Sequence, residues 1–130
     1  MKSILLDTNA YSAYVKGDQK VMDAIVDSQE ILVSVFVMGE LYYGFKSGSR
    51  EPENLAGLKR FLKKPTVVTI KANKETAELY GEIKSQLRKQ GTPIPVNDIW
   101  IAAHCMEKGA TLVTYDKDFN NIHNLRIWKP

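Results

Sequence analysis

The chain has only one cysteine among its 130 residues, and this limits how the fold can be stabilised. Cys105 has no second thiol with which to form an internal disulfide or to share a zinc ion. No apolar run approaches the roughly 18 residues that span a bilayer, and the N-terminus lacks the basic, apolar and small-residue segments of a secretion signal. We therefore expect a soluble protein of the reducing cytoplasm, with no membrane segment.

Size and hydrophobic content predict a single domain over residues 1–130. Hydrophobic residues make up 44% of the sequence, and there is no internal repeat, linker or low-complexity tract. Predicted strands alternate with predicted helices, which favours an α/β fold with a mainly parallel central sheet. The expected strands are residues 4–6, 31–35, 66–70, 111–114 and 125–128, and the expected helices are residues 10–16, 18–29, 36–45, 51–64, 73–90 and 98–108, the last capped by Asn97.

The net charge of +3 is unevenly distributed. Residues 46–74 contain eight basic and two acidic side chains, which gives that segment a charge of +6. Residues 1–45 contain three bases and six acids, and residues 75–130 contain seven of each. Such a basic segment can bind a polyanion, although a solvated lysine-rich helix face has the same composition.

Acidic side chains stand at the ends of predicted elements. Asp7 ends an apolar run, Asp98 begins a helix, and Asp116 and Asp118 follow a later strand. Each has an ordinary structural explanation, because aspartate caps helices, suits the first helical turn and is common in turns. Taken singly, none of these residues indicates a function.

Glu40 is harder to explain by local structure. It is the only charged residue from Val33 to Phe45, so its helix is expected to be largely buried. A carboxylate in a low-dielectric interior must be paired, protonated or bound to a cation. The alternatives are that Glu40 points outward or meets a distant base.

The acids are more informative together. In a parallel sheet, Asp7 and Asp116 would lie at the carboxyl ends of two strands, and Glu40 and Asp98 on helices that leave the same edge. Converging carboxylates require a counter-charge, and ligand sets made only of oxygen suit Mg²⁺ or Mn²⁺. A site of this kind can bind a phosphodiester and activate water for its hydrolysis.

Four segments, taken in order, resemble the PIN-domain nucleases. They are Leu5-Leu6-Asp7-Thr8-Asn9, Met38-Gly39-Glu40-Leu41, Asn97-Asp98-Ile99-Trp100-Ile101-Ala102-Ala103 and Thr114-Tyr115-Asp116-Lys117-Asp118-Phe119. The resemblance covers essentially the whole chain. Its length and motif order look most like the VapC-type toxins of bacterial toxin–antitoxin pairs. The resemblance implies a three-layer α/β/α, Rossmann-like domain.

The resemblance also implies an activity and a site. Proteins of this type are Mg²⁺- or Mn²⁺-dependent endoribonucleases that cut transfer RNA or ribosomal RNA at single loops. They are inhibited by a cognate VapB-type antitoxin and are usually dimeric. The motifs assign the metal-binding catalytic roles to Asp7, Glu40, Asp98 and Asp116. Supporting positions behind these ligands fall on Thr8, Asn9, Thr114 and Asp118, with Asp116 favoured over Asp118 as the direct ligand.

Two surfaces are expected to serve the partners of such an enzyme. The basic segment is predicted to hold RNA through Lys46, Arg50, Lys59, Arg60, Lys63 and Lys64. The antitoxin is predicted to cover Tyr42, Tyr43 and Phe45 and to reach a basic side chain toward the acids. We interpret His104, Cys105, Trp100 and Trp128 as core or flanking residues.

Three other functions compete with the toxin interpretation. A housekeeping PIN nuclease would have the same acids but no antitoxin. A non-catalytic RNA-binding module is disfavoured because all four acids are present. A phosphoacceptor domain of the haloacid-dehalogenase type would need a second aspartate two residues after Asp7, and Asn9 occupies that position.

Overall fold

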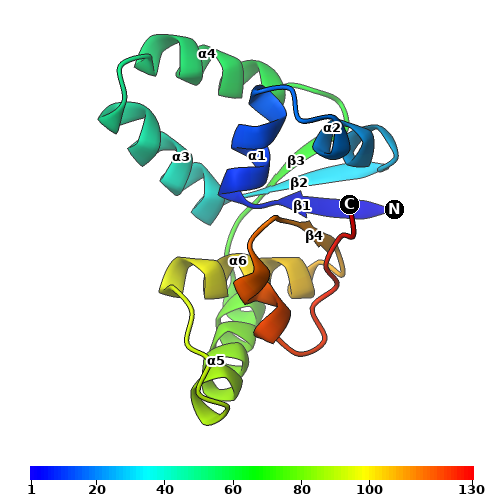
Figure 1. The fold of residues 1–130 in the computed structure, drawn as a ribbon, viewed down its shortest axis with the longest axis vertical. Helices are drawn as coiled ribbons and strands as arrows, with labels where there is room; N and C mark the ends of the chain where they lie inside the picture. Colours follow the sequence, from blue (N-terminus) through cyan, green and yellow to red (C-terminus); the bar gives the residue numbers. More distant parts are fainter.

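In the computed structural model, which describes residues 1–130, four parallel strands form one sheet between layers of helices (Figure 1). The strands are β1 (Ser3–Leu6), β2 (Glu30–Ser34), β3 (Val67–Ile70) and β4 (Thr111–Val113), in the order β3-β2-β1-β4. The apolar residues of β1 and β2 are buried, as expected for parallel strands covered on both faces. The predicted α/β class with a parallel sheet is confirmed.

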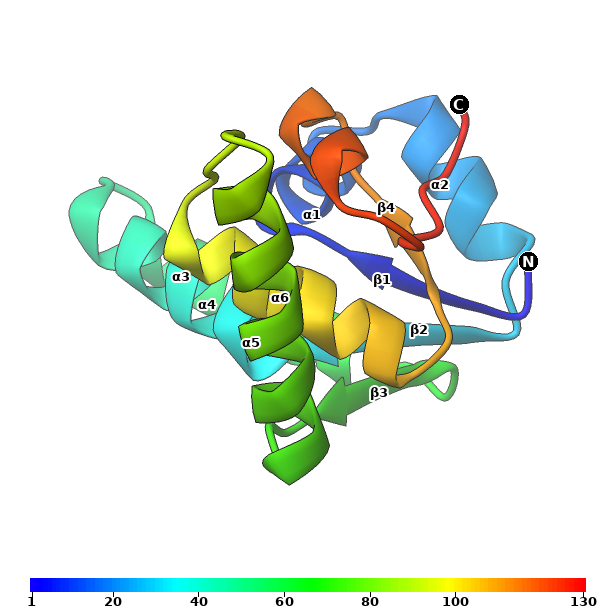
Figure 2. The ribbon, with the colours of Figure 1, turned by 90° about the horizontal axis from the view of Figure 1, so that it is seen from below.

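Six helices surround the sheet. They are α1 (Thr8–Val15), α2 (Gln19–Val26), α3 (Val35–Ser47), α4 (Glu51–Leu62), α5 (Lys74–Lys89) and α6 (Val96–Glu107). Helices α1, α2 and α4 lie on one side of the sheet and α5 and α6 on the other, while α3 and α4 form a hairpin that projects beyond the strands (Figures 1 and 2). None of the helices combines the length and hydropathy needed to cross a membrane.

Side chains at the helix starts explain the local boundaries. Asp7 caps α1 by accepting the Ala10 amide at 2.8 Å, and Ser34 caps α3 by accepting the Phe36 amide at 3.1 Å. Helices α1 and α2 separate at Gly17, whose φ of 91° disfavours residues with a side chain. Asp7 directly follows β1 and Ser34 is the last residue of β2, so the carboxyl end of the sheet continues into helices at once.

The strand order reverses beside β1. From β1 the chain moves outward through β2 to β3, and β4 then returns to the opposite side of β1. The register aligns Leu6 with Val113, so the residues that follow β1 and β4 are neighbours. Open α/β sheets bind ligands outside the carboxyl ends of strands at such a reversal. The fold therefore places Asp7 and Thr114 at the favoured position for a site.

Several predicted boundaries are wrong. The helix expected over residues 18–29 ends at Val26, and Val35, expected in a strand, is the first residue of α3. Residues 125–128 form only an isolated parallel bridge between Ile127 and Leu112, because the chain beyond Asn124, whose φ is 66°, runs beside a β4 of three residues. Helix α6 starts at Val96 after Pro95, so Asn97 lies inside the first turn instead of capping it. The side chain of Asn97 instead donates to the Phe36 carbonyl of α3.

The expectation that α3 is largely buried is also wrong. Only Val37 and Leu41 are buried, Glu40 is half-buried, and Tyr43 is 75% exposed. The helix packs one narrow face inward because it extends past the sheet as half of the α3–α4 hairpin. The isolation of Glu40 in the sequence thus does not reflect a wholly buried helix.

The predictions for the C-terminal core are mostly confirmed. His104 and Cys105 are fully buried, and Trp128 is 8% exposed. Trp100 is only half-buried and stacks on Tyr80 with ring centroids 4.0 Å apart. Burial raises the pKa of the Cys105 thiol to about 12, so this cysteine is chemically inert.

Candidate active site

The candidate site begins where β1 and β4 end. Asp7 is 5% exposed, and its amide donates to the Val113 carbonyl at 3.2 Å. One oxygen of the Asp7 carboxylate accepts the Ala10 amide, and the other accepts the Thr114 hydroxyl. This buried carboxylate is therefore held by the end of each strand and by the start of α1.

The loop after β4 brings a second acid to the same place. The Asp116 amide donates to the Thr114 hydroxyl oxygen at 2.9 Å, and the Asp116 carboxylate accepts the Asp118 amide at 2.9 Å. Asp116 thereby caps the short 3₁₀ helix η1 (Lys117–Asn121). Tyr115 anchors the loop from its other side by donating to the Asp18 carboxylate at 3.0 Å.

Glu40 reaches the site from α3. The hydroxyl of Thr8, the first residue of α1, donates to a Glu40 carboxylate oxygen. Because Thr8 directly follows Asp7, this bond fixes Glu40 relative to the end of β1. Thr8 and Thr114 thus hold one carboxylate each, which agrees with supporting positions for both.

Asp98 lies in the first turn of α6 and is half-buried. Burial, followed in order of size by the negative charges of Glu40, Asp116, Asp7 and Asp118, raises the pKa of Asp98 to about 6. Burial also raises the pKa of Asp7, where hydrogen bonds from Thr114 and Ala10 oppose the shift and the charges of Asp116 and Glu40 add to it. Asp98 therefore lies in the electric field of the other four acids, and we refer to these five residues as the acidic cluster.

The acidic cluster has the donor chemistry of a site for a hard divalent cation. All its potential ligand atoms are carboxylate oxygens. No lysine or arginine contributes appreciably to the pKa values of Asp7 and Asp98, so no basic side chain neutralises these two acids. In the present arrangement, however, no three acidic, histidine or cysteine side chains are close enough together to hold one ion. The oxygens of Asp7 and one oxygen of Glu40 are instead turned toward threonine and backbone donors.

The side chains of two predicted supporting residues, Asn9 and Asp118, form no hydrogen bond with another acid. Asn9 is exposed on α1, and its side chain makes no hydrogen bond. Asp118 is exposed and contacts Asp116 only through its amide. Sequence reasoning missed Tyr115, whose anchoring of the Asp116 loop depends on a contact 97 residues distant in sequence.

The predicted RNA-binding residues fall into two groups. A cleft of about 810 Å³ between α1, α3 and α4 is lined by Thr8 and Glu40, and its lining also includes Arg50, Arg60 and Lys64. It also includes Lys16, which sequence reasoning missed because it lies outside the basic segment. The other three predicted bases lie outside the cleft, namely Lys46, Lys59 and Lys63.

Ion pairs partly neutralise the N-terminal end of the basic segment. Lys46 pairs with Glu51 and Arg50 pairs with Glu53, each at 3.5 Å. The bases at the end of α4 form no ion pair and are exposed. The free positive charge beside the cleft therefore lies at the C-terminal end of α4.

A family model agrees with this fold. The model of the PIN domain matches residues 4–125, from the first strand to the segment after η1. The chain therefore belongs to the PIN domain family.

Relatives of similar length refine this assignment. The chain is 30% identical over 126 residues to ribonuclease VapC2 of Rickettsia felis, covering 93% of this chain and 92% of the relative. It is 26% identical over 130 residues to the tRNA(fMet)-specific endonuclease VapC of Salmonella typhimurium, covering 98% and 97%. The fold matches the crystal structure of Rickettsia felis VapBC2 bound to a promoter DNA fragment with a TM-score of 0.86 and 27% identity, over 98% of this chain and 99% of that one. Within the PIN domain family, the chain belongs with the VapC ribonucleases.

Proposed function

We propose that the protein is a metal-dependent endoribonuclease toxin that hydrolyses phosphodiester bonds in structured RNA. The observation that carries this proposal is that four other acids lie close enough to Asp98 to influence its charge, at the reversal of the strand order. Asp98 has its pKa raised to about 6, first by burial and then by four neighbouring carboxylates. Keeping so many like charges together is costly unless a cation or a phosphate-bound cation joins them.

Asp7, Glu40, Asp98 and Asp116 would hold Mg²⁺ or Mn²⁺ in this scheme. The bound ion would supply charge neutralisation at the phosphate and a more acidic water for in-line attack. Hydrolysis forms a bond from the water oxygen to phosphorus and breaks the bond from phosphorus to the leaving nucleotide oxygen. Thr8 and Thr114 orient two of the carboxylates, and Asp118 supports Asp116 through its amide.

RNA would reach the acids along the cleft. Its lining includes Glu40 of the acidic cluster together with the basic side chains Lys16, Arg50, Arg60 and Lys64. Arginine and lysine contact phosphates without regard to sequence, so these side chains would hold the backbone and leave selectivity to the shape of the RNA. The name of the Salmonella relative supports a transfer RNA loop as the substrate class, and a ribosomal RNA loop is the alternative.

A VapB-type antitoxin would restrain this activity. Solved structures that match the chain include the VapBC2 assembly and a toxin–antitoxin complex from Klebsiella pneumoniae. Tyr42 and Tyr43 are 40% and 75% exposed beside the half-buried Phe45, so an apolar partner segment could cover them. A homodimer or a toxin–antitoxin hetero-oligomer in the cytoplasm is the form we propose.

RNA cleavage by the purified chain tests the proposal. We expect transfer RNA to be cut in Mg²⁺ or Mn²⁺, to remain intact in chelator, and to be cut orders of magnitude more slowly by Asp7→Asn. Asp27→Asn removes an exposed carboxylate outside the acidic cluster and is the matched control.

The alternative functions predict different outcomes when the cleavage assay is run with and without the products of adjacent genes. Binding without metal-dependent cleavage would identify an RNA-binding module. Cleavage that no adjacent gene product suppresses would identify a housekeeping nuclease.

A further inference from the structure

Three side chains on one face of α6 contact the first turn of α3. Asn97, Trp100 and His104 are spaced three and four residues apart, so they form a continuous line along the helix, which we call the α6 stripe. Asp98 is also carried by α6, and α3 carries Glu40. The α6 stripe therefore connects the two helices that supply these acids.

Phe36 is the centre of the contact on α3. Its ring stacks on Trp100 with centroids 5.1 Å apart and planes 19° apart, and it meets His104 at 5.2 Å. Its carbonyl accepts the Asn97 side-chain amide at 3.4 Å. This carbonyl lies four residues before Glu40, in the position that accepts the Glu40 amide in a regular helix. Asn97 thus contacts the backbone turn that carries Glu40.

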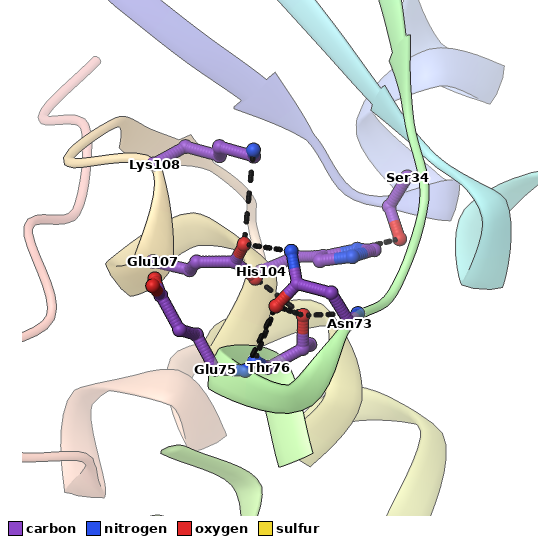
Figure 3. Close-up of polar contacts among 7 residues, drawn as sticks. All are labelled: Ser34, Asn73, Glu75, Thr76, His104, Glu107 and Lys108. Carbon is purple, nitrogen blue, oxygen red and sulfur yellow. Dashed lines mark hydrogen bonds and ion pairs between the residues drawn. The ribbon is translucent and has the colours of Figure 1, made fainter. Parts of the chain in front are cut away.

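The buried end of the α6 stripe is a hydrogen bond between His104 and Ser34 (Figure 3). Nδ1 of His104 and the Ser34 hydroxyl are 2.8 Å apart, and both residues are fully buried. One hydrogen joins Nδ1 to the Ser34 hydroxyl, whose oxygen also accepts the Phe36 amide. Burial lowers the pKa of His104 and a contact with the Lys71 backbone opposes this, although Nε2 forms no hydrogen bond of normal geometry.

An unpartnered buried nitrogen is costly, and a leucine would fill the same space without that cost. The polar contact that His104 gains in exchange is the bond to Ser34, the residue that caps α3.

The C-terminal end of α6, just beyond His104, is also anchored (Figure 3). Glu107 accepts hydrogen bonds from Asn73 and Thr76 at the start of α5. Helix α6 is therefore held at its C-terminus by α5 and along its length by α3, and it cannot move away from α3 without breaking buried contacts. This rigidity opposes the repulsion between Glu40 and Asp98.

We infer that the α6 stripe positions Glu40 beside Asp98 for a shared divalent cation, with Asn97 and His104 as positioning residues. The inference rests on the proposed function, since it assumes that the acids bind a metal. Residues behind metal ligands typically change metal affinity by about 10-fold to 100-fold when they are replaced.

Mn²⁺ binding to the RNA-free chain tests the inference by calorimetry. Asn97→Ala removes the amide from a half-buried position, and we expect it to weaken Mn²⁺ binding by about tenfold while leaving the melting temperature in chelator nearly unchanged. Asn121→Ala removes a half-buried amide on η1, far from α3 in sequence, and should change neither quantity.

A second variant separates positioning from packing. His104→Leu fills the core but cannot bond Ser34, so it should weaken Mn²⁺ binding although the melting temperature in chelator is maintained. Cleavage by both variants should recover at high Mn²⁺ concentration, because the ligands themselves are intact. If His104→Leu does not fold, the Mn²⁺ affinity of Asn97→Ala alone decides whether the α6 stripe positions the acids.

The outcomes distinguish this inference from the proposed function. Wild-type affinity for Mn²⁺ in both variants would overturn the positioning role and leave the metal site standing. Absence of Mn²⁺ binding by the wild-type chain would overturn the metal site and the inference together. Weaker binding by one variant alone would support the role at that end of the stripe.

Discussion

The hydroxyl of Thr114 donates to the Asp7 carboxylate and thereby joins the ends of β4 and β1. The same oxygen accepts the Asp116 amide at 2.9 Å. One buried threonine thus orients two acids that come from opposite ends of the chain. This double role requires a side chain that both donates and accepts in a small space.

Thr114→Val should damage both stability and cleavage. The variant leaves one oxygen of the Asp7 carboxylate and the Asp116 amide without a partner, so the free energy of unfolding should fall by about 1–3 kcal/mol. RNA cleavage should fall by about 10-fold to 100-fold. Thr114→Ser keeps the hydroxyl and is the control for denaturant unfolding and cleavage assays. Equal behaviour of the two variants would show that only the packing of Thr114 matters.

Asp98→Asn should stabilise the metal-free protein near neutral pH. The folded pKa of Asp98, about 6, lies above its ordinary value of 3.8, so the folded state binds more protons between these values. The free energy of unfolding therefore decreases as pH rises through this window, and the loss is complete above about pH 6.

Asparagine does not ionise, so this variant avoids the loss. We expect a gain on the order of 1 kcal/mol at pH 7, after allowance for solvent screening of a half-buried group, and none below about pH 4. Thermal melts in chelator across this pH range measure the difference. A variant less stable than wild type at pH 7 would argue against clustered acids.

The cleft bases should contribute more to RNA binding than the neighbouring bases outside it. Arg60 and Lys64 line the cleft, whereas Lys59 and Lys63 lie on the same helix end but outside it. Replacing Arg60 and Lys64 with alanine should reduce the slope of log affinity against log salt by about 1.4, roughly 0.7 for each phosphate contact to a single strand.

The pair of alanines at Lys59 and Lys63 is the matched control, with the same change of charge. Filter binding of catalytically inactive protein at several salt concentrations measures both slopes. Identical slopes for the two pairs would mean that all bases at this helix end attract RNA equally, and that the RNA does not bind along the cleft.

Tyr43→Ala should weaken the complex with the antitoxin. Tyr43 is 75% exposed, so its removal costs little packing in the free toxin, but aromatic side chains of this kind are frequent hot spots in interfaces. We expect dissociation of the co-expressed complex to become at least about tenfold faster. Val26→Ala changes an 80% exposed residue on α2 and is the control. An unaltered complex would place the antitoxin elsewhere.

Local sequence patterns were sufficient to predict the class of fold. A buried apolar run that ends at Asp7 and a β-branched run at residues 66–70 predicted strands, and glycines marked most helix ends. These signals are reliable because they depend on neighbours within a few residues. Residues 125–128 were misassigned because β propensity cannot tell whether a partner strand is long enough to pair.

The sequence by itself also predicted which acids form the proposed site, since four motifs in order point to Asp98 and to three of the acids whose charges raise its pKa in the structure. Only the tertiary structure decided how they are held there. The bonds from Thr8 to Glu40 and from Thr114 to Asp7 join residues 32 and 107 positions apart, and the α6 stripe joins two helices that are separate in sequence. The division of the basic segment by the cleft is also set by helix packing. Such relationships depend on how helices and strands pack against one another. Local sequence patterns do not specify which distant residues this packing brings into contact.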